Sequence, residues 1–128
     1  VVGDGGIQMT IQELATVAQA RLPIKILLLN NSYLGMVRQW QQLFFEKRYS
    51  FTPITGPDYE KLEESYGIKA KRISRSEELS SALTEMFETE GPYLLEVVVE
   101  KEDNIFPMIP PGASVADILL EPPQNKNK

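Results

Sequence analysis

Two oxygen-bearing side chains, Asp4 and Asn31, are the residues of this chain best suited to chemistry. Asp4 lies in Gly3-Asp4-Gly5-Gly6, which we interpret as a tight turn that opens a helix. Glycine lets backbone N–H groups approach an anion closely, and the amino end of a helix attracts negative charge. A carboxylate there would repel a diphosphate unless a cation stood between them, and Mg²⁺ is often shared between carboxylate and phosphate oxygens. The segment therefore predicts a site for a magnesium-bound diphosphate.

The elements around these residues predict that Asp4 and Asn31 meet. Residues 1–2 are typical of the end of a buried strand, and residues 24–29 form a short apolar run typical of a strand buried on both faces. A helix over residues 10–21 would join them and make the strands parallel. Because ligands of open α/β sheets bind at the carboxyl ends of the strands, both side chains are expected at that edge.

The rest of the chain predicts further alternation of helices and strands. Such alternation indicates an α/β fold, a three-layer α/β/α arrangement with a mostly parallel sheet. One domain is expected over residues 1–120, and residues 121–128 are expected to form a disordered tail. The other predicted elements are helices from residue 34 or 36 to 47, over 59–66, and from residue 76 or 77 to 90, strands over 69–73 and 93–99, and a short helical segment within 115–120.

Composition excludes several classes of function. The chain has 128 residues, which suffices for one small domain, and a net charge of -5 with scattered Lys and Arg, which argues against nucleic acid as a partner. No apolar run is long enough to cross a membrane. Cysteine and histidine are both absent, which removes thiol catalysis, the Ser-His-Asp triad and His-bearing zinc sites. Chemistry must therefore come from a cofactor, a metal held by oxygen ligands, or another chain.

Each of these features also has a plainer interpretation. A lone Gly-Asp-Gly is most often only a turn, and Asn30-Asn31 is most often a helix cap or turn. The apolar stripe within residues 36–40 would by default pack in a core. Thr10 to Glu13 has the form of a capping box, so Glu13 is interpreted as a helix cap rather than a catalytic acid. Two polar features after consecutive strands nevertheless favour the metal site.

The chain resembles thiamine-diphosphate enzymes, whose signature is a Gly-Asp-Gly followed after a gap by one or two Asn. Here these are Gly3-Asp4-Gly5 and Asn30-Asn31. Within that superfamily the chain is similar to acetolactate synthase (acetohydroxyacid synthase) over almost its whole length, and the segment from Gly35 to Gln41 is highly specific. The segments that carry this similarity are residues 12–16, 30–31, 34–41, 48–50, 91–97 and 107–108.

The resemblance implies roles for individual residues. Asp4 and Asn31 would be ligands of Mg²⁺, with the Tyr33 carbonyl as the third protein ligand. Many relatives have Ser at the position of Gly6, so a hydroxyl contact to the diphosphate would be lost here. Trp40 would shape the site for the second 2-ketoacid, favouring 2-ketobutyrate over pyruvate, and would contact herbicides of this enzyme. The residues implied to bind thiamine diphosphate are Gly3, Asp4, Gly5, Gly6, Asn31, Gly35, Met36 and Val37.

The implied activity is that of a transferase of branched-chain amino-acid biosynthesis. It condenses pyruvate with a second 2-ketoacid, pyruvate or 2-ketobutyrate, with loss of CO₂, and it uses thiamine diphosphate and Mg²⁺. FAD would bind elsewhere in the full-length flavoprotein. The glutamate that activates the cofactor belongs to a domain missing here, so no catalytic residue is expected in this chain. We expect a fragment of a thiamine-diphosphate-binding domain, truncated at its N-terminus, that forms no acetolactate alone.

The same resemblance implies partners and leaves alternatives open. A homodimer or tetramer of the full chain, a regulatory small subunit and a cytoplasmic, bacterial location are expected. Another thiamine-diphosphate decarboxylase or carboligase, such as glyoxylate carboligase or oxalyl-CoA decarboxylase, is an alternative against which Trp40 argues. A non-catalytic module that binds Mg²⁺-diphosphate or a nucleotide is the alternative from a different class.

Overall fold

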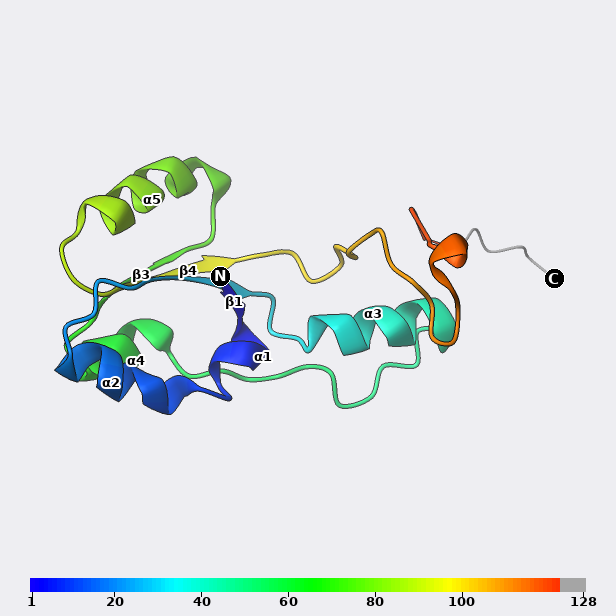
Figure 1. Ribbon diagram of the computed structural model, residues 1–128, viewed down its shortest axis with the longest axis horizontal. Coiled ribbons are helices and arrows are strands. Elements are labelled where there is room, and N and C mark those ends of the chain that lie inside the picture. The colour runs from blue at the N-terminus through cyan, green and yellow to red at the C-terminus, as the bar shows by residue number, and fades with distance from the viewer. Residues whose placement is uncertain (123–128) are drawn as a thin grey trace. The chain divides into compact units, whose positions relative to one another are not determined.

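The chain divides into two units in the computed structural model, which describes residues 1–122 (Figure 1). The sheet unit comprises Val1–Leu34 and Pro53–Lys101. The α3 unit comprises Gly35–Thr52 and the described residues from Glu102 onward. The tail predicted for residues 121–128 lies, from residue 123 on, outside the described residues.

The sheet unit is built on four parallel strands in the order β1-β2-β4-β3. The register places Gly3 beside Leu29 and Leu28 beside Glu96. The predicted α/β fold with a parallel sheet is therefore confirmed. The strands are β1 (Val2–Gly3), β2 (Lys25–Asn30), β3 (Lys69–Ile73) and β4 (Tyr93–Val98).

Helices cover both faces of this sheet, so the predicted three-layer arrangement is confirmed (Figure 1). Consecutive side chains of a strand point to opposite faces, and β4 shows this directly. Tyr93 and Leu95 pack with Met86 of α5, whereas Leu94 packs with Tyr59 of α4. One face carries α5 (Leu79–Glu88), preceded by the 3-10 helix η2 (Ser76–Glu78), and the other carries α1 (Asp4–Ile7), α2 (Leu14–Gln19) and α4 (Tyr59–Ser65).

The first helical region differs from the prediction. The segment interpreted as a tight turn is the start of α1, and the helix predicted over residues 10–21 is divided into the 3-10 helix η1 (Ile11–Glu13) and α2. Thr10 has φ -132° and ψ 17°, not the extended backbone of a capping residue, and its side chain forms no cap. Glu13 precedes α2 but its side chain makes no capping hydrogen bond either. The predicted capping box and the role of Glu13 as a cap are therefore wrong.

Burial on both faces holds for one strand only. In β4 the residues from Tyr93 to Glu96 are buried, because α5 and α4 cover its two faces and a strand lies on each side. In β2 only Leu28 is fully buried, and Leu29 is 37% exposed. The prediction that β2 is buried on both faces is therefore wrong in this chain.

The α3 unit consists of α3 (Gly35–Phe44), the following loop and the segment from Glu102. α3 ends before the predicted residue 47 because Glu46 and Lys47 have positive φ, 55° and 57°, which a right-handed helix cannot contain. The helical segment predicted within residues 115–120 is the 3-10 helix η3 (Val115–Asp117).

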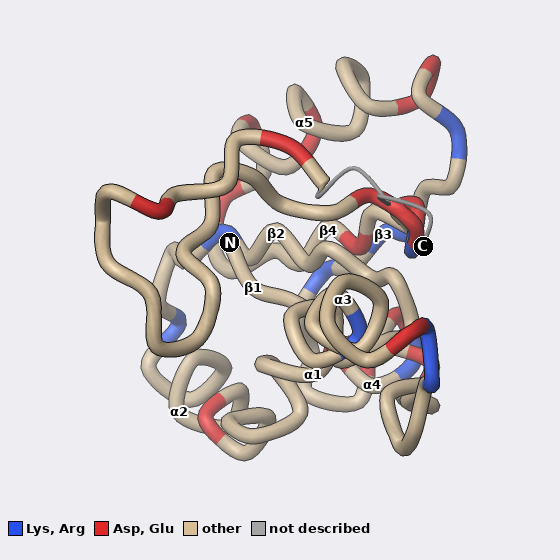
Figure 2. Tube along the Cα trace, turned by 90° about the vertical axis from the view of Figure 1, so that its right-hand side faces the viewer, with Lys and Arg blue, Asp and Glu red and all other residues tan. Residues whose placement is uncertain are grey.

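Charged residues are distributed along the chain rather than gathered. Figure 2 shows Lys and Arg interspersed with Asp and Glu along the Cα trace, in agreement with the scattered pattern of the sequence. Over residues 1–122, none of the helices has the length and apolar character needed to span a membrane.

Candidate functional site

Asp4 lies at the carboxyl end of β1 and is the first residue of α1, as the sequence predicts. The residue is only 3% exposed. Its backbone carbonyl accepts hydrogen bonds from the Tyr59 hydroxyl at 3.3 Å and from Gln8 Nε2 at 3.2 Å. These contacts from α4 and from the next turn of the chain hold the carboxylate at the edge of the sheet where ligands of α/β proteins bind.

Asn31 follows directly on β2, beside the end of β1. Its Oδ1 accepts from the Tyr33 N–H at 3.0 Å, so the side chain folds over the turn formed by residues 31–33. The Ser32 carbonyl accepts from the Ile54 N–H at 3.0 Å and anchors the turn from the other side. An amide oxygen has a second lone pair, so Asn31 Oδ1 can still serve as a metal ligand.

Asp4 and Asn31 follow neighbouring strands, because β1 pairs with β2 and Gly3 lies beside Leu29. Burial raises the pKa of the Asp4 carboxyl, and the nearby backbone N–H groups of Asp4 itself, Gly5, Ser32 and Asn31 oppose that rise. Within residues 1–122, no Lys or Arg forms an ion pair with Asp4. A buried carboxylate that lacks a cationic partner is stabilised by a bound cation.

The donor set at this edge fits a hard cation. Over the described part of the chain, no group of three Asp or Glu residues gathers around a common point. A metal beside Asp4 would therefore be held by fewer than three carboxylates, together with amide, carbonyl and phosphate oxygens. Mg²⁺ is bound in this way, through one or two carboxylates and substrate phosphates, so the residues fit it. The Tyr33 carbonyl as a ligand stays a prediction.

Close packing, in addition to the predicted binding role, favours glycine at the start of α1. A Cβ on Gly5 would lie 2.9 Å from Leu34 Cδ2 and 3.4 Å from Ile54 Cδ1. A Cβ on Gly6 would lie 3.2 Å from Val2 Cγ2. Gly3 is less restricted, because its nearest contact would be at 4.0 Å. Contact of these glycines with a diphosphate stays a prediction.

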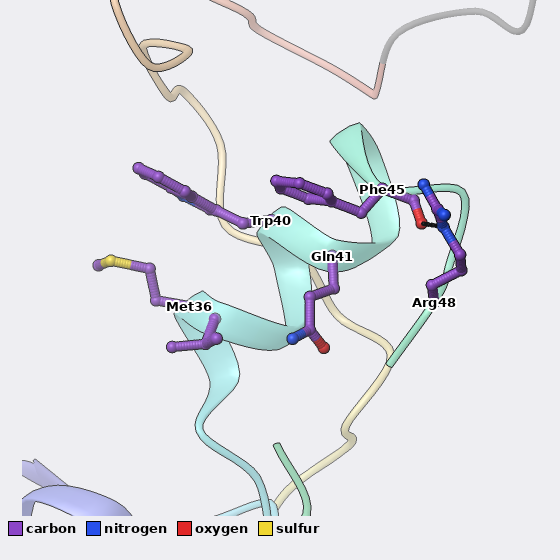
Figure 3. Close-up of a pocket in the computed structure, with 6 residues that line it drawn as sticks. Met36, Trp40, Gln41, Phe45 and Arg48 are labelled. Atoms are coloured by element: carbon purple, nitrogen blue, oxygen red, sulfur yellow. Dashed lines mark hydrogen bonds between the residues drawn. The ribbon is translucent and has the colours of Figure 1, made fainter. Parts of the chain in front are cut away.

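In the α3 unit the predicted apolar stripe forms the wall of an open groove. Met36, Val37 and Trp40 are 74%, 48% and 37% exposed, so the interpretation of this stripe as core is wrong for this chain. Figure 3 shows Met36 and Trp40 projecting from the same side of α3, whose first residue is Gly35. The groove has a volume of about 580 Å³ and is lined by Met36, Val37, Trp40, Gln41, Phe45 and Arg48.

The opposite side of α3 carries two buried polar residues that the sequence did not identify. Gln39 binds the Ile105 backbone in both directions: its Nε2 donates to the carbonyl and its Oε1 accepts from the N–H, each at 2.9 Å. Arg38 pairs with Glu102 at 2.6 Å and lies 4.7 Å from the centre of the Tyr49 ring. Helical periodicity would place both residues in solvent, so their burial is explained by contacts with Tyr49 and with residues 102–105.

Gln39→Ala should release the Ile105 backbone from α3. The variant would leave a partly buried N–H and carbonyl without their partners, at a cost of about 1–2 kcal/mol. We expect hydrogen exchange of the Ile105 amide to accelerate roughly tenfold. Gln12→Ala, a change of the same type at an exposed position of η1, is the control. Unchanged Ile105 protection in Gln39→Ala would show that the contact does not order this segment.

The fold and the site together define a class of protein. A parallel α/β sheet with a buried Asp and an Asn turn at neighbouring strand ends is suited to bind a diphosphate together with a hard cation. Residues 1–97 match the family described as thiamine pyrophosphate enzyme, C-terminal TPP binding domain. Because this match covers most of its length, the chain belongs to that family, as the resemblance implied.

Within this family, the chain is similar to acetolactate synthases. The chain is 48% identical over 120 residues to the acetolactate synthase isozyme 2 large subunit of Escherichia coli (strain K12), with 93% of this chain and 22% of the relative covered. It is 44% identical over 122 residues to the mitochondrial acetolactate synthase catalytic subunit of Saccharomyces cerevisiae, with coverages of 95% and 18%. The chain thus spans about a fifth of the length of these curated relatives.

A solved structure shows the same fold. The thiamine diphosphate-dependent 4-hydroxybenzoylformate decarboxylase of Rhodococcus jostii RHA1 matches with a TM-score of 0.70 and 26% identity. The match covers 77% of this chain and 19% of the decarboxylase chain. The three-layer arrangement of the sheet unit is therefore an arrangement found in thiamine-diphosphate enzymes.

Proposed function

We propose that this chain is the thiamine-diphosphate-binding part of an acetolactate synthase large subunit. The enzyme would condense pyruvate with a second 2-ketoacid and release CO₂. The position of Asp4 and the Asn31 turn at the carboxyl ends of the neighbouring strands β1 and β2 is the structural observation that carries this proposal. The similarity to acetolactate synthases, at 39–48% identity, favours this enzyme over other decarboxylases of the same fold.

The proposal assigns a task to each part of the site. Asp4 and Asn31 would hold Mg²⁺, with the Tyr33 carbonyl as a third ligand, beside the diphosphate. The backbone of Gly5 and Gly6 at the start of α1 contributes N–H groups to the same diphosphate. When bound, thiamine diphosphate supplies the carbon nucleophile and the electron sink that 2-ketoacid decarboxylation requires.

The proposal also assigns roles to residues of the α3 groove. Met36 and Val37 lie against the cofactor, and Trp40 forms a wall for the second 2-ketoacid. All three are suited to this by their exposure in the described chain, because a side chain buried in the core would not be available to a ligand. The activating glutamate and FAD belong to other parts of the full-length enzyme, which would assemble as a dimer or tetramer with a regulatory small subunit.

A chimera tests the acetolactate synthase assignment. These 128 residues would replace the corresponding segment of the E. coli isozyme 2 large subunit, with the intact E. coli enzyme as the control. We expect the chimera to form acetolactate from pyruvate when thiamine diphosphate and Mg²⁺ are supplied. A folded chimera that binds thiamine diphosphate but forms no acetolactate would contradict the assignment.

Calorimetry of the chain by itself separates the proposal from a nucleotide-binding module. We expect heat of binding with thiamine diphosphate, dependent on Mg²⁺, and none with ATP under the same conditions. Binding of ATP in preference to thiamine diphosphate would favour the module.

A further inference from the structure

Asn30 and Glu96 form a buried pair next to the candidate metal site. Asn30 Nδ2, at the end of β2, donates to Glu96 Oε1 at 2.7 Å. Glu96 lies in β4, the strand adjacent to β2, and is 1% exposed. Among residues 1–122, the cation that pairs with this carboxylate is Arg72, whose half-exposed side chain places Nε 3.7 Å from Glu96 Oε1. The hydrogen bond from Asn30 is therefore the short polar contact of Glu96.

The same Asn30 side chain holds the turn that carries the predicted metal ligands. Asn30 Oδ1 accepts from the Ser32 N–H at 2.9 Å and lies 3.3 Å from the Ser32 hydroxyl. Ser32 has φ 59°, a left-handed conformation that residues other than glycine rarely adopt. It stands between Asn31 and Tyr33, so its backbone decides where those two residues direct their oxygens.

An amide is the side chain that makes both contacts at once. Its nitrogen donates to the Glu96 carboxylate while its oxygen accepts from the Ser32 N–H. A carboxylate at position 30 would have no proton for Glu96, and an apolar side chain would bind neither group. Asn30 thus connects the turn to the buried strand β4.

We infer that Asn30 and Glu96 are positioning residues for the Mg²⁺-diphosphate site, an inference that rests on the proposed function for its ligand. Neither residue is itself a proposed ligand. Their part is to hold the turn of residues 31–33 in the conformation that presents Asn31 and Tyr33 beside Asp4. Groups that orient metal ligands in this way typically contribute about 10–100-fold to metal affinity.

Exchanging the two functional groups tests the inference. Asn30→Asp places a carboxylate where Nδ2 lay 2.7 Å from Glu96, so the pair should separate. Glu96→Gln keeps an acceptor for Asn30 Nδ2 and serves as the matched control. In the double variant Asn30→Asp/Glu96→Gln, the new Gln donates to the new Asp, whose second oxygen still accepts from the Ser32 N–H. The contact is thereby restored with its direction reversed.

Two measurements on the chain separate positioning from a purely structural role. In the ligand-free chain, we expect Asn30→Asp to accelerate hydrogen exchange at the Ser32 and Tyr33 amides. In a Mg²⁺ titration with thiamine diphosphate present, we expect the same variant to weaken metal binding about 10–100-fold. Glu96→Gln and the double variant should both stay near the unmodified chain.

The inference depends on whether the double variant restores the behaviour that Asn30→Asp changes. An Asn30→Asp variant that exchanges normally at Ser32 and Tyr33 would overturn the inference, as would a double variant that exchanges as fast as the single one. A loss of thermal stability without any change in these two amides or in Mg²⁺ affinity would also overturn it. If the unmodified chain binds no thiamine diphosphate, the exchange rates of the ligand-free variants still decide the role of Asn30, and the chimera still tests the proposed function.

Discussion

Replacing Glu63 by Gln is expected to stabilise the chain above neutral pH and to flatten the pH dependence of its stability. Glu63 lies on α4, one helical turn after Tyr59, and is fully buried. Within the described residues, neither of its carboxylate oxygens has a hydrogen-bond partner. Burial in these surroundings raises the pKa of Glu63 to about 7. A carboxylate in this position is therefore destabilising once it ionises.

The sign of the effect follows from the direction of the shift. The folded state binds the proton more tightly than the unfolded state, whose pKa for a glutamate is near 4.5. The contribution to stability is present in full below the unfolded pKa and is lost as the pH rises through about 7. The loss between these limits is about 3 kcal/mol, at about 1.4 kcal/mol for each unit of pKa.

Urea denaturation at several pH values between 5 and 8 measures this loss. The chain contains no histidine, so no imidazole obscures the interval. Glu63→Gln carries no charge at any pH, and at pH 8 we expect it to be about 1–3 kcal/mol more stable than the unmodified chain, less any cost of its buried amide. Glu64→Gln, the same change at the exposed neighbouring position, is the control. Equal pH dependence of the unmodified chain and Glu63→Gln would show that Glu63 does not titrate in the folded core.

Asp4→Asn should abolish Mg²⁺-dependent binding of thiamine diphosphate. Asn keeps the size of the side chain and an oxygen acceptor but removes the carboxylate that is proposed as a ligand of Mg²⁺. Since residues that merely orient metal ligands contribute about 10–100-fold, loss of a charged ligand should weaken Mg²⁺ binding by more than about 100-fold. The measurement is a Mg²⁺ titration by calorimetry at saturating thiamine diphosphate.

The same substitution should also raise the stability of the ligand-free chain. Asp4 is buried without an ion-pair partner among the described residues, and burial is the largest influence on its pKa. Stability gained together with binding lost is the behaviour of a residue kept for function rather than for folding. Glu13→Gln, at an exposed position, is the control. Retention of Mg²⁺-dependent binding in Asp4→Asn would remove Asp4 from the metal site.

The positions of Asp4 and Asn31 could be predicted from the sequence, because they depend on local patterns and one topological rule. Short apolar runs mark parallel strands, and polar residues directly after two such strands meet when the strands are neighbours. β1 and β2 are neighbours in the sheet, so the inference holds. The division of residues 4–19 into three short helices was not accessible, because the backbone of Thr10 departs from the capping conformation that its sequence pattern indicates.

The amino-acid sequence by itself thus determined the parallel α/β fold, the edge of the sheet that carries the site, and the two strand ends that meet there. Only the tertiary structure decided which polar groups are buried and what they bind. Asn30 and Gln39 each bond to a residue 66 positions away, and Glu63 is buried without a partner in the described chain. Periodicity reports which face of an element is apolar, whereas the partner of a polar side chain depends on contacts between segments far apart in the sequence.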